Sequence, residues 1–414
     1  IISRYIPVRR LPDEPQLMRW MGTVQNASAH PVSGADLFSE RNAILATAGE
    51  ALERYLWQEA TDHFIKPLYA TETEIHARGT YISPSAFAGV SPAMRREKKY
   101  AITDSSKFLW VQAQSLTTGR SVYVPAQTIS GSRTITAHSG TVEPIIRQQI
   151  TTGAAVWPTQ SIARLRGIYE LLERDAYMIW WLNQLELPRL DLAPLAAASP
   201  ELAKTLEILG RYRLRVHAIA LISDAPVTTI MVIVEDLTDT APRYAFGLKS
   251  GKSAAQCILG ALPEALRARI AGRQKVESSG AWNTATPIEK IGHLDRLHYW
   301  THPEHSRLLE KFVRTPVQER LAPLWETDTD EAHLARIIEW CKKVGYDCHA
   351  VSPGASKKNV LPWKIEVVSI PQLQPTYLHE SMQHTAGLRL TSVPQAHGFT
   401  PLSLPRLTTP HPVA

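Results

Sequence analysis

The chain has 414 residues, of which 44% are hydrophobic, and its 45 basic and 39 acidic side chains give a formal net charge of +6. No run of eighteen apolar residues and no apolar signal-peptide core are present, so neither membrane insertion nor export is predicted. The basic residues are scattered apart from RREKK at 95–99, which argues against nucleic acid as a partner. Cys257, Cys341 and Cys348 form no CxxC pair, and this favours a reducing cytoplasm.

The N-terminal third combines turns, one helix and a strand-rich region. The first 38 residues are rich in Pro, Ser, Gly and Asn and predict a strand or two joined by turns. A helix should follow, because Ser39 is a suitable N-cap and apolar residues recur at helical spacing as far as Tyr55. Segments such as FLWVQAQSL and GRSVYVPAQTI predict strands within 100–150.

The strongest helical pattern runs from Gln160 to Leu185, with Pro158 ahead of it and Pro188 beyond it. The following region alternates in the βα manner. We expect a helix at 199–211, strands at 213–222, 227–236 and 243–248, and a helix from Ser253 to Arg273.

Two further helices are expected at 306–324 and 331–344, before strands in YDCHAVSP and KIEVVSIP. Five prolines between 394 and 412 exclude a regular helix and predict an extended C-terminal tail. We therefore divide the chain into a main domain over 1–390 and a proline-rich tail over 391–414.

Three of these helices carry a related acidic pattern. GEALERY at 49–55 and YELLERDA at 169–176 place two Glu residues and an Arg on one helical face. PEALRARI at 263–270 keeps the first Glu but has Arg in place of the second, and its Pro263 predicts a kink or a helix start. The pattern comprises Glu50, Glu53, Arg54, Glu170, Glu173, Arg174, Glu264 and Arg267.

Carboxylates one helical turn apart, brought near a similar pair, form an oxygen-rich site that suits Mg²⁺. Nucleotide phosphates can complete its coordination, and nearby Arg residues can bind those phosphates. The competing interpretation of one such pattern is a solvated helix face with local ion pairs. The apolar surroundings of the second pattern, from Ile168 to Trp181, favour burial and therefore a partner or a metal.

The segment GLKSGKS at 247–253 ends like a phosphate-binding P-loop. Only three residues separate Gly247 from Gly251 where the motif needs four, so the motif is not met. Lys249 and Lys252 remain candidate phosphate neighbours because the segment leads into the third acidic helix, and a solvated loop is the alternative.

On these motifs the chain resembles the YcaO-domain family. TTGAAVWPTQSIARLRGIYELLERDAYMIWW is similar to the family's Asn-Gly-Leu-Ala-Ala-Gly loop and the helix after it. LFSERNAILATAGEALERY and FGLKSGKSAAQCILGALPEALRAR are similar to its first and third helices, and EWCKKVGYDCHAVSPG and KIEVVSIPQLQP to its late strands. Ala35, Asp36 and Leu37 stand where the family has Gly-Lys-Gly. Thr152, Trp157 and Arg267 replace a family Asn, Gly and Gln.

The resemblance implies a mixed α/β fold in which strands support three acidic helices around a site for ATP and Mg²⁺. It implies that Glu50, Glu53, Glu170 and Glu173 are metal ligands. It also implies that Glu264, Arg54 and Arg174 belong to the nucleotide site, with Arg267 a further candidate for phosphate contact.

The implied activity is that of an azoline-forming cyclodehydratase. An enzyme of this kind uses ATP to activate a backbone amide of a ribosomally made precursor peptide. A Cys, Ser or Thr side chain then closes a thiazoline or oxazoline ring. A leader-peptide-binding protein, a flavin-dependent azoline dehydrogenase and an oligomeric assembly are the implied partners.

The proline-rich ending is similar to the tail that enters the active site in azoline-forming family members. His411 and the terminal carboxylate of Ala414 are therefore candidate bases, whereas a disordered tail with a solvated His411 is the alternative. Two further alternatives stay open for the whole chain: a thioamide- or amidine-forming enzyme, and a non-catalytic scaffold subunit.

Overall fold

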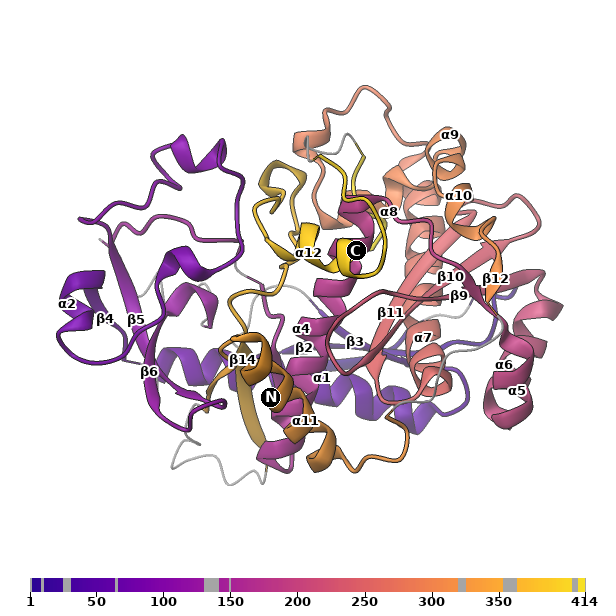
Figure 1. The fold of residues 1–414 in the computed structure, drawn as a ribbon. Helices are drawn as coiled ribbons and strands as arrows, with labels where there is room; N and C mark the ends of the chain where they lie inside the picture. The colour runs from indigo at the N-terminus through magenta and orange to yellow at the C-terminus, as the bar shows by residue number, and fades with distance from the viewer. Residues whose placement is uncertain are drawn as a thin grey trace.

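The computed structural model describes residues 2–8, 11–24, 31–63, 66–129, 141–148, 150–318, 325–352, 363–403 and 409–413. In this part of the chain three β-sheets are packed against helices, so the predicted mixed α/β fold is confirmed (Figure 1). None of the helices described is long and apolar enough to cross a membrane.

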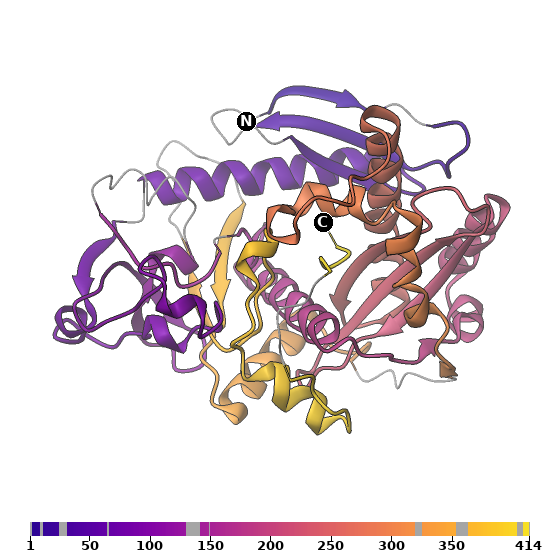
Figure 2. The same ribbon diagram turned by 90° about the horizontal axis from the view of Figure 1, so that it is seen from above.

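The N-terminal sheet is antiparallel and lies on the first helix. It contains β1 (Ile2–Pro7), β2 (Met18–Val24) and β3 (Val32–Asp36), where one or two strands were expected. Helix α1 (Glu40–His63) packs on β2 and β3, as Figure 2 shows. Ser39 caps it as predicted, because its Oγ accepts the amide of Asn42 at 3.2 Å.

The second sheet is built from distant parts of the chain. Its order is β4-β5-β13-β14-β7, with β6 paired to β5, and every pairing is antiparallel. The strands are β4 (Leu68–Thr71), β5 (Lys107–Ser115), β6 (Ser121–Pro125), β7 (Ala154–Trp157), β13 (His349–Val351) and β14 (Lys364–Ser369). Within the strand-rich region expected at 100–150, the described residues contain only β5 and β6.

The third sheet has the order β11-β10-β9-β8-β12. Its strands are β8 (Arg189–Leu190), β9 (Leu214–Ala220), β10 (Thr228–Asp236), β11 (Tyr244–Gly251) and β12 (Val317–Gln318). Strands β9, β10 and β11 fall where the sequence predicted them, but they pair antiparallel rather than through βα crossovers. The helices beside this sheet are α5 (Leu192–Ala198), α6 (Pro200–Arg211) and α7 (Ala254–Ser279), and α7 packs along β10 and β11.

Helix α4 (Gln160–Asn183) lies at the centre of the molecule (Figure 1). It contacts β14 and β7 of the second sheet and β11 and β10 of the third. Every residue from Ala176 to Leu182 is buried, in a core shared with Phe246 and Leu248 of β11. Helix α11 (Asp330–Val344) packs on its N-terminal half. Because α4 touches both sheets, it fixes their relative placement.

The helix expected at 306–324 is instead broken into short pieces. The described residues form α8 (His293–Tyr299), α9 (Pro303–Arg307) and α10 (Glu310–Val313), and 319–324 lie outside them. Pro316 explains the early end, because a proline disfavours helical geometry at the residue before it.

The tail from 391 is not wholly extended, because α12 (Arg389–Ala396) contains Pro394. A proline cannot donate to the carbonyl four residues earlier, and here the Leu390 carbonyl accepts the side-chain amide of Asn183 at 3.0 Å instead. Pro263 likewise lies inside α7, which begins at Ala254 close to the expected Ser253, so of the two alternatives for Pro263 the helix start is excluded.

Candidate active site

Helices α1, α4 and α7 bring their acidic residues together, so that their charges influence one another. Glu53 of α1 is affected by Glu170 of α4, and Glu173 of α4 is affected by both Glu170 and Glu264 of α7. Glu173 is buried, and the other acidic side chains are partly buried. The predicted group of five carboxylates is therefore a single electrostatic cluster, which we call the acidic cluster: Glu50, Glu53, Glu170, Glu173 and Glu264.

Main-chain amides orient four of these carboxylates. In each case one carboxylate oxygen accepts an N–H group, and the second oxygen remains for another partner. The amides are those of Ser33 to Glu50 at 3.1 Å, Gly153 to Glu170 at 3.0 Å, Ser250 to Glu173 at 2.8 Å and Leu248 to Glu264 at 2.9 Å. The carboxylates are thus held in place by the strands and loops beside their helices.

Two glycines permit this close approach. Gly153 has a φ of +95°, and a Cβ atom there would lie 2.3 Å from the carbonyl oxygen of Val368. A Cβ on Gly247 would lie 2.1 Å from the carbonyl oxygen of Ala261 in α7. Side chains at either position would push the amide donors away from the acidic cluster.

The predicted arginines stand beside these carboxylates. Arg54 lies 3.7 Å from the free oxygen of Glu50, and Arg174 lies 3.9 Å from that of Glu173. Burial opposes the charge of Arg174, but the neighbouring carboxylates outweigh it and raise its pKa. Arg267 donates to the carbonyl of Ser33 at 2.9 Å, so it supports the loop that orients Glu50.

The two lysines of GLKSGKS have different surroundings. The carbon stem of Lys249 lies against Gly260 of α7. Burial raises the pKa of Glu173, and the charges of Arg174 and Lys249 offset part of that rise. The ammonium group of Lys252 binds Asp330 and the carbonyl of Asp328, each at 2.7 Å. Lys252 therefore ties the start of α7 to the start of α11, where Asp330 compensates its charge.

The cluster has a surplus of negative charge that suits a cation. Burial, together with the nearby Glu170, raises the pKa of Glu53 to about 8. No three acidic side chains of the described residues stand close enough to hold a metal by themselves. The residues fit Mg²⁺ when it shares its coordination among a few carboxylates, phosphate oxygens and water, which is its usual mode with nucleotides.

The end of the tail is packed against α4 one turn beyond Glu173. The amide of Val413 donates to the hydroxyl of Tyr177 at 3.1 Å. The ring of His411 lies between Tyr177 and Tyr377, with Nδ1 at 3.2 Å from the Tyr177 hydroxyl and Nε2 at 3.1 Å from the Tyr377 carbonyl. His411 is only 3% exposed, so the alternative of a solvated tail histidine was wrong.

These contacts make His411 a poor base. Burial and the charges of Arg296 and Arg174 lower its pKa, which disfavours the imidazolium form near neutral pH. Both ring nitrogens already have partners. Ala414 lies outside the described residues, and it follows directly after Val413.

Buried ion pairs hold the segments around the tail. Arg389 of α12 binds Asp175 of α4 through two bonds of 2.8 Å, and Asp175 also accepts the amide of Gln374. Arg296 and Glu380, both fully buried, pair at 2.8 Å. Asp175 lies inside the ERDA pattern, but its partner Arg389 is 214 positions away, and no pattern in the sequence predicted that pair.

A narrow cleft lies beside Arg174, with about 20 Å³ of space for water-sized molecules. Its walls come from the loop before β7, from α4 and from the segment after β14. Arg147, Gln148, Thr152, Leu171, Arg174 and Gln374 are among the residues that line it. Arg147 was not predicted, because it belongs to no motif, and Gln374 was not singled out within KIEVVSIPQLQP.

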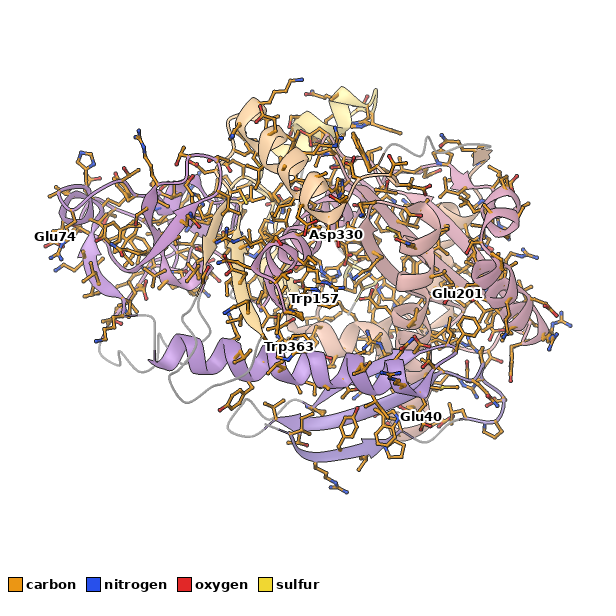
Figure 3. The ribbon with its side chains drawn as sticks, turned by 90° about the horizontal axis from the view of Figure 1, so that it is seen from below. Glu40, Glu74, Trp157, Glu201, Asp330 and Trp363 are labelled. Carbon is orange, nitrogen blue, oxygen red and sulfur yellow. The ribbon has the colours of Figure 1, made fainter. Side chains whose placement is uncertain are left out.

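The positions that depart from the family pattern have structural roles. Asp36 accepts the amides of Phe38 and Ser39 at 2.8 and 2.6 Å, and so it stabilises the start of α1. The guanidinium carbon of Arg166 lies 3.7 Å from the ring centre of Trp157. Figure 3 shows Trp157 and Trp363 near the centre of the molecule, beside α1.

Sequence and structure comparisons identify the family. The model described as YcaO cyclodehydratase, ATP- and Mg²⁺-binding, matches residues 37–358, so this chain belongs to the YcaO family. No curated protein sequence matches the chain. The family assignment confirms the resemblance inferred from the acidic helices, and the family is one that binds ATP and Mg²⁺.

Solved structures share the fold at low sequence identity. A heterocyclase in complex with substrate and cofactor has a TM-score of 0.70 and 16% identity over 97% of this chain, which spans 53% of the heterocyclase's length. YcaO from Methanopyrus kandleri, bound with AMPPCP and Mg²⁺, has a TM-score of 0.62 and 16% identity over 90% of this chain and 86% of its own. The E. coli microcin synthetase McbBCD complex has a TM-score of 0.60 and 12% identity, and the match covers 89% of this chain and 87% of the matched chain.

Proposed function

We propose that this chain is an ATP- and Mg²⁺-dependent cyclodehydratase that forms azoline rings in a ribosomally made precursor peptide. One observation carries the proposal: the acidic cluster and the end of the C-terminal tail meet on the same helix, at Glu173, Arg174 and Tyr177 of α4. Membership of the YcaO family supports the same chemistry.

The residues that would hold Mg²⁺ are Glu50, Glu53, Glu170 and Glu173, and Glu264 joins them from α7. Main-chain amides hold the carboxylates of Glu50, Glu170, Glu173 and Glu264, so these four need little reorientation when the cation arrives. Arg54, Arg174 and Lys249 supply positive charge for the phosphates. We retain Arg267 as a support of the Ser33 loop and assign no phosphate contact to Lys252.

In the proposed reaction, the side-chain S–H or O–H of a Cys, Ser or Thr adds to the carbonyl carbon of the preceding amide. A new bond to carbon forms, the carbonyl electron pair moves to oxygen, and the attacking group loses its proton. ATP supplies a phosphoryl group to that oxygen, so that phosphate can leave. The amide nitrogen then loses its proton and forms the C=N bond, so the peptide loses one water in total.

The tail supplies a base for these proton losses. Tyr177 and His411 anchor the tail up to Val413, so the next group along the chain is Ala414, which carries a carboxylate if the chain ends there. We propose that this carboxylate accepts the proton and that His411 only positions it. Tyr177→Phe should therefore lower the rate of ring formation while Mg·ATP binding is retained.

Partners are proposed on the same basis. We propose a leader-peptide-binding partner protein, because the proposed substrate is a long and flexible precursor peptide. The McbBCD structure is a multiprotein complex, and a flavin-dependent azoline dehydrogenase and an oligomer remain proposals. The three free, buried cysteines agree with the proposed cytoplasmic location.

The test is mass spectrometry of the co-encoded precursor peptide after incubation with the chain, its leader-binding partner, Mg²⁺ and ATP. Loss of one water per modified residue, with one ADP released per ring, is the expected result. Exchange of sulfur for oxygen would identify a thioamide-forming enzyme. Binding of peptide without mass change or ADP release would favour the scaffold role.

A further inference from the structure

Arg147 is a cation without an ionic partner in the described part of the chain. Its guanidinium stands 5.4 Å from the ring centre of Phe87 and forms no hydrogen bond or ion pair with any described residue. It lines the cleft beside Arg174 and also the cleft that adjoins it. Burial lowers the pKa of Arg147 to about 10, so it still carries its charge at neutral pH.

The surroundings of Arg147 concentrate positive charge. Arg95 donates to the carbonyls of Tyr100, Ile145 and Ile146, which fixes the backbone that leads to Arg147. Together with burial, the charges of Arg147 and Arg95 depress the pKa of His384 to about 3. Glu143 lines the adjoining cleft, and its carboxylate accepts the amide of Leu109 at 2.9 Å.

Arg174 connects this cleft to the acidic cluster. It lies beside Glu173 on one side and lines the cleft on the other. The cleft also offers apolar walls, including Leu171 and Leu373, and the amide side chains of Gln148 and Gln374. Only about 20 Å³ of this cleft is free for a water-sized molecule, whereas the adjoining cleft, which Arg147 and Gln148 also line, offers about 470 Å³ and is large enough for a short peptide segment.

We propose that the reacting amide of the peptide lies in the adjoining cleft, with the oxygen that is phosphorylated directed into the narrow cleft that Arg147 and Arg174 both line. This rests on the proposed function and extends it to the peptide subsite. When the side chain adds to the carbonyl carbon, the amide oxygen becomes negative, and phosphorylation increases the negative charge beside it. Two arginine side chains can stabilise this negative charge, and one of them, Arg174, also belongs to the nucleotide site.

The test compares Arg147→Met with Arg96→Met, the same change at an exposed arginine of the same region. We expect Arg147→Met to lower peptide-dependent ring formation about 100-fold, as loss of one oxyanion donor does. Mg·ATP binding without peptide should change less than about twofold, because Arg147 does not touch the acidic cluster. Arg96→Met should behave like the wild type in both assays.

A second readout does not depend on turnover. Inorganic phosphate should raise the unfolding temperature of the wild type, raise it less for Arg147→Lys, and leave that of Arg147→Met unchanged. Circular dichroism of each variant would establish that it is folded. If the wild type forms no rings, the proposed function fails, while the phosphate shift still tests the anion site.

Two results would overturn the proposal. One is ring formation by a folded Arg147→Met at the wild-type rate. The other is an equal phosphate shift for the wild type and Arg147→Met, since the anion would then bind without Arg147.

Discussion

Individual side chains in the site differ in how their charge is compensated. Glu173 has a backbone amide on one oxygen and Arg174 near the other, whereas Glu53 has no hydrogen-bond donor among the described residues. His384 is the opposite case, a buried base held neutral among arginines. Such groups couple proton binding to stability.

His384 should make the protein sensitive to mild acid. Its Nε2 accepts the amide of Gln148 at 3.3 Å, and its pKa is lowered to about 3 from an ordinary value near 6.5. Between these values the unfolded chain binds a proton that the folded one does not, so stability is full above pH 6.5 and is lost as the pH falls. From pH 7 to pH 5 this group should remove about 2 kcal/mol of unfolding free energy.

Denaturant unfolding at several pH values checks this. His384→Gln keeps a hydrogen-bond acceptor and should lose less stability than the wild type between pH 7 and pH 5, while His76→Gln, at an exposed histidine, should match the wild type. Equal pH dependence in all three proteins would show that His384 is not the responsible group.

Strand β11 is the element on which the site depends most, since its amides at Leu248 and Ser250 orient Glu264 and Glu173. Gly247→Ala would place a Cβ 2.1 Å from the Ala261 carbonyl and should separate β11 from α7. We expect a loss of at least about 2 kcal/mol in unfolding free energy. Mg·ATP binding should also weaken.

Gly210 provides the matched control, because it is an exposed residue of α6 with no atom within 4 Å of an added Cβ. Gly210→Ala should stabilise the protein by up to about 1 kcal/mol. Thermal unfolding and nucleotide titration of both variants measure these effects. If Gly247→Ala binds nucleotide as the wild type does, the strand does not control the carboxylates.

Helix α12 is attached to α4 by the buried pair of Arg389 and Asp175. Arg389→Met should cost about 3–5 kcal/mol, because it leaves Asp175 buried without its counter-ion. Arg211→Met removes an exposed ion pair with Glu207 and should change stability by less than about 0.5 kcal/mol. Chemical denaturation of the two variants distinguishes these cases, and similar losses would contradict the assigned role of the buried pair.

Elements with a strong local pattern could be predicted from the sequence. Helix α4 and strands β9 to β11 fall where apolar periodicity placed them, and the acidic residues were found by their spacing. The helix through Pro394 could not be predicted, because the amide that compensates for the proline belongs to Asn183. Arg147, Tyr177 and the partner of Lys252 were missed for the same reason: their roles depend on contacts between distant segments.

At the scale of the molecule, α4 lies between two sheets and presents one face to both the acidic cluster and the tail. The cleft with Arg147 opens beside the same helix. Under the proposed function, this arrangement would bring the nucleotide site, the peptide site and the proline-rich tail to one place.

The most direct test of this account compares Glu173→Gln with Glu186→Gln, an exposed residue just beyond α4, in the peptide mass assay with Mg²⁺ and ATP. The wild type and Glu186→Gln should remove one water per modified residue at rates within about twofold of each other. Glu173→Gln should be slower by about 100-fold or more, because it loses a preorganised carboxylate of the cation site. Ring formation by Glu173→Gln at the wild-type rate would contradict the assignment of the acidic cluster as the reaction site.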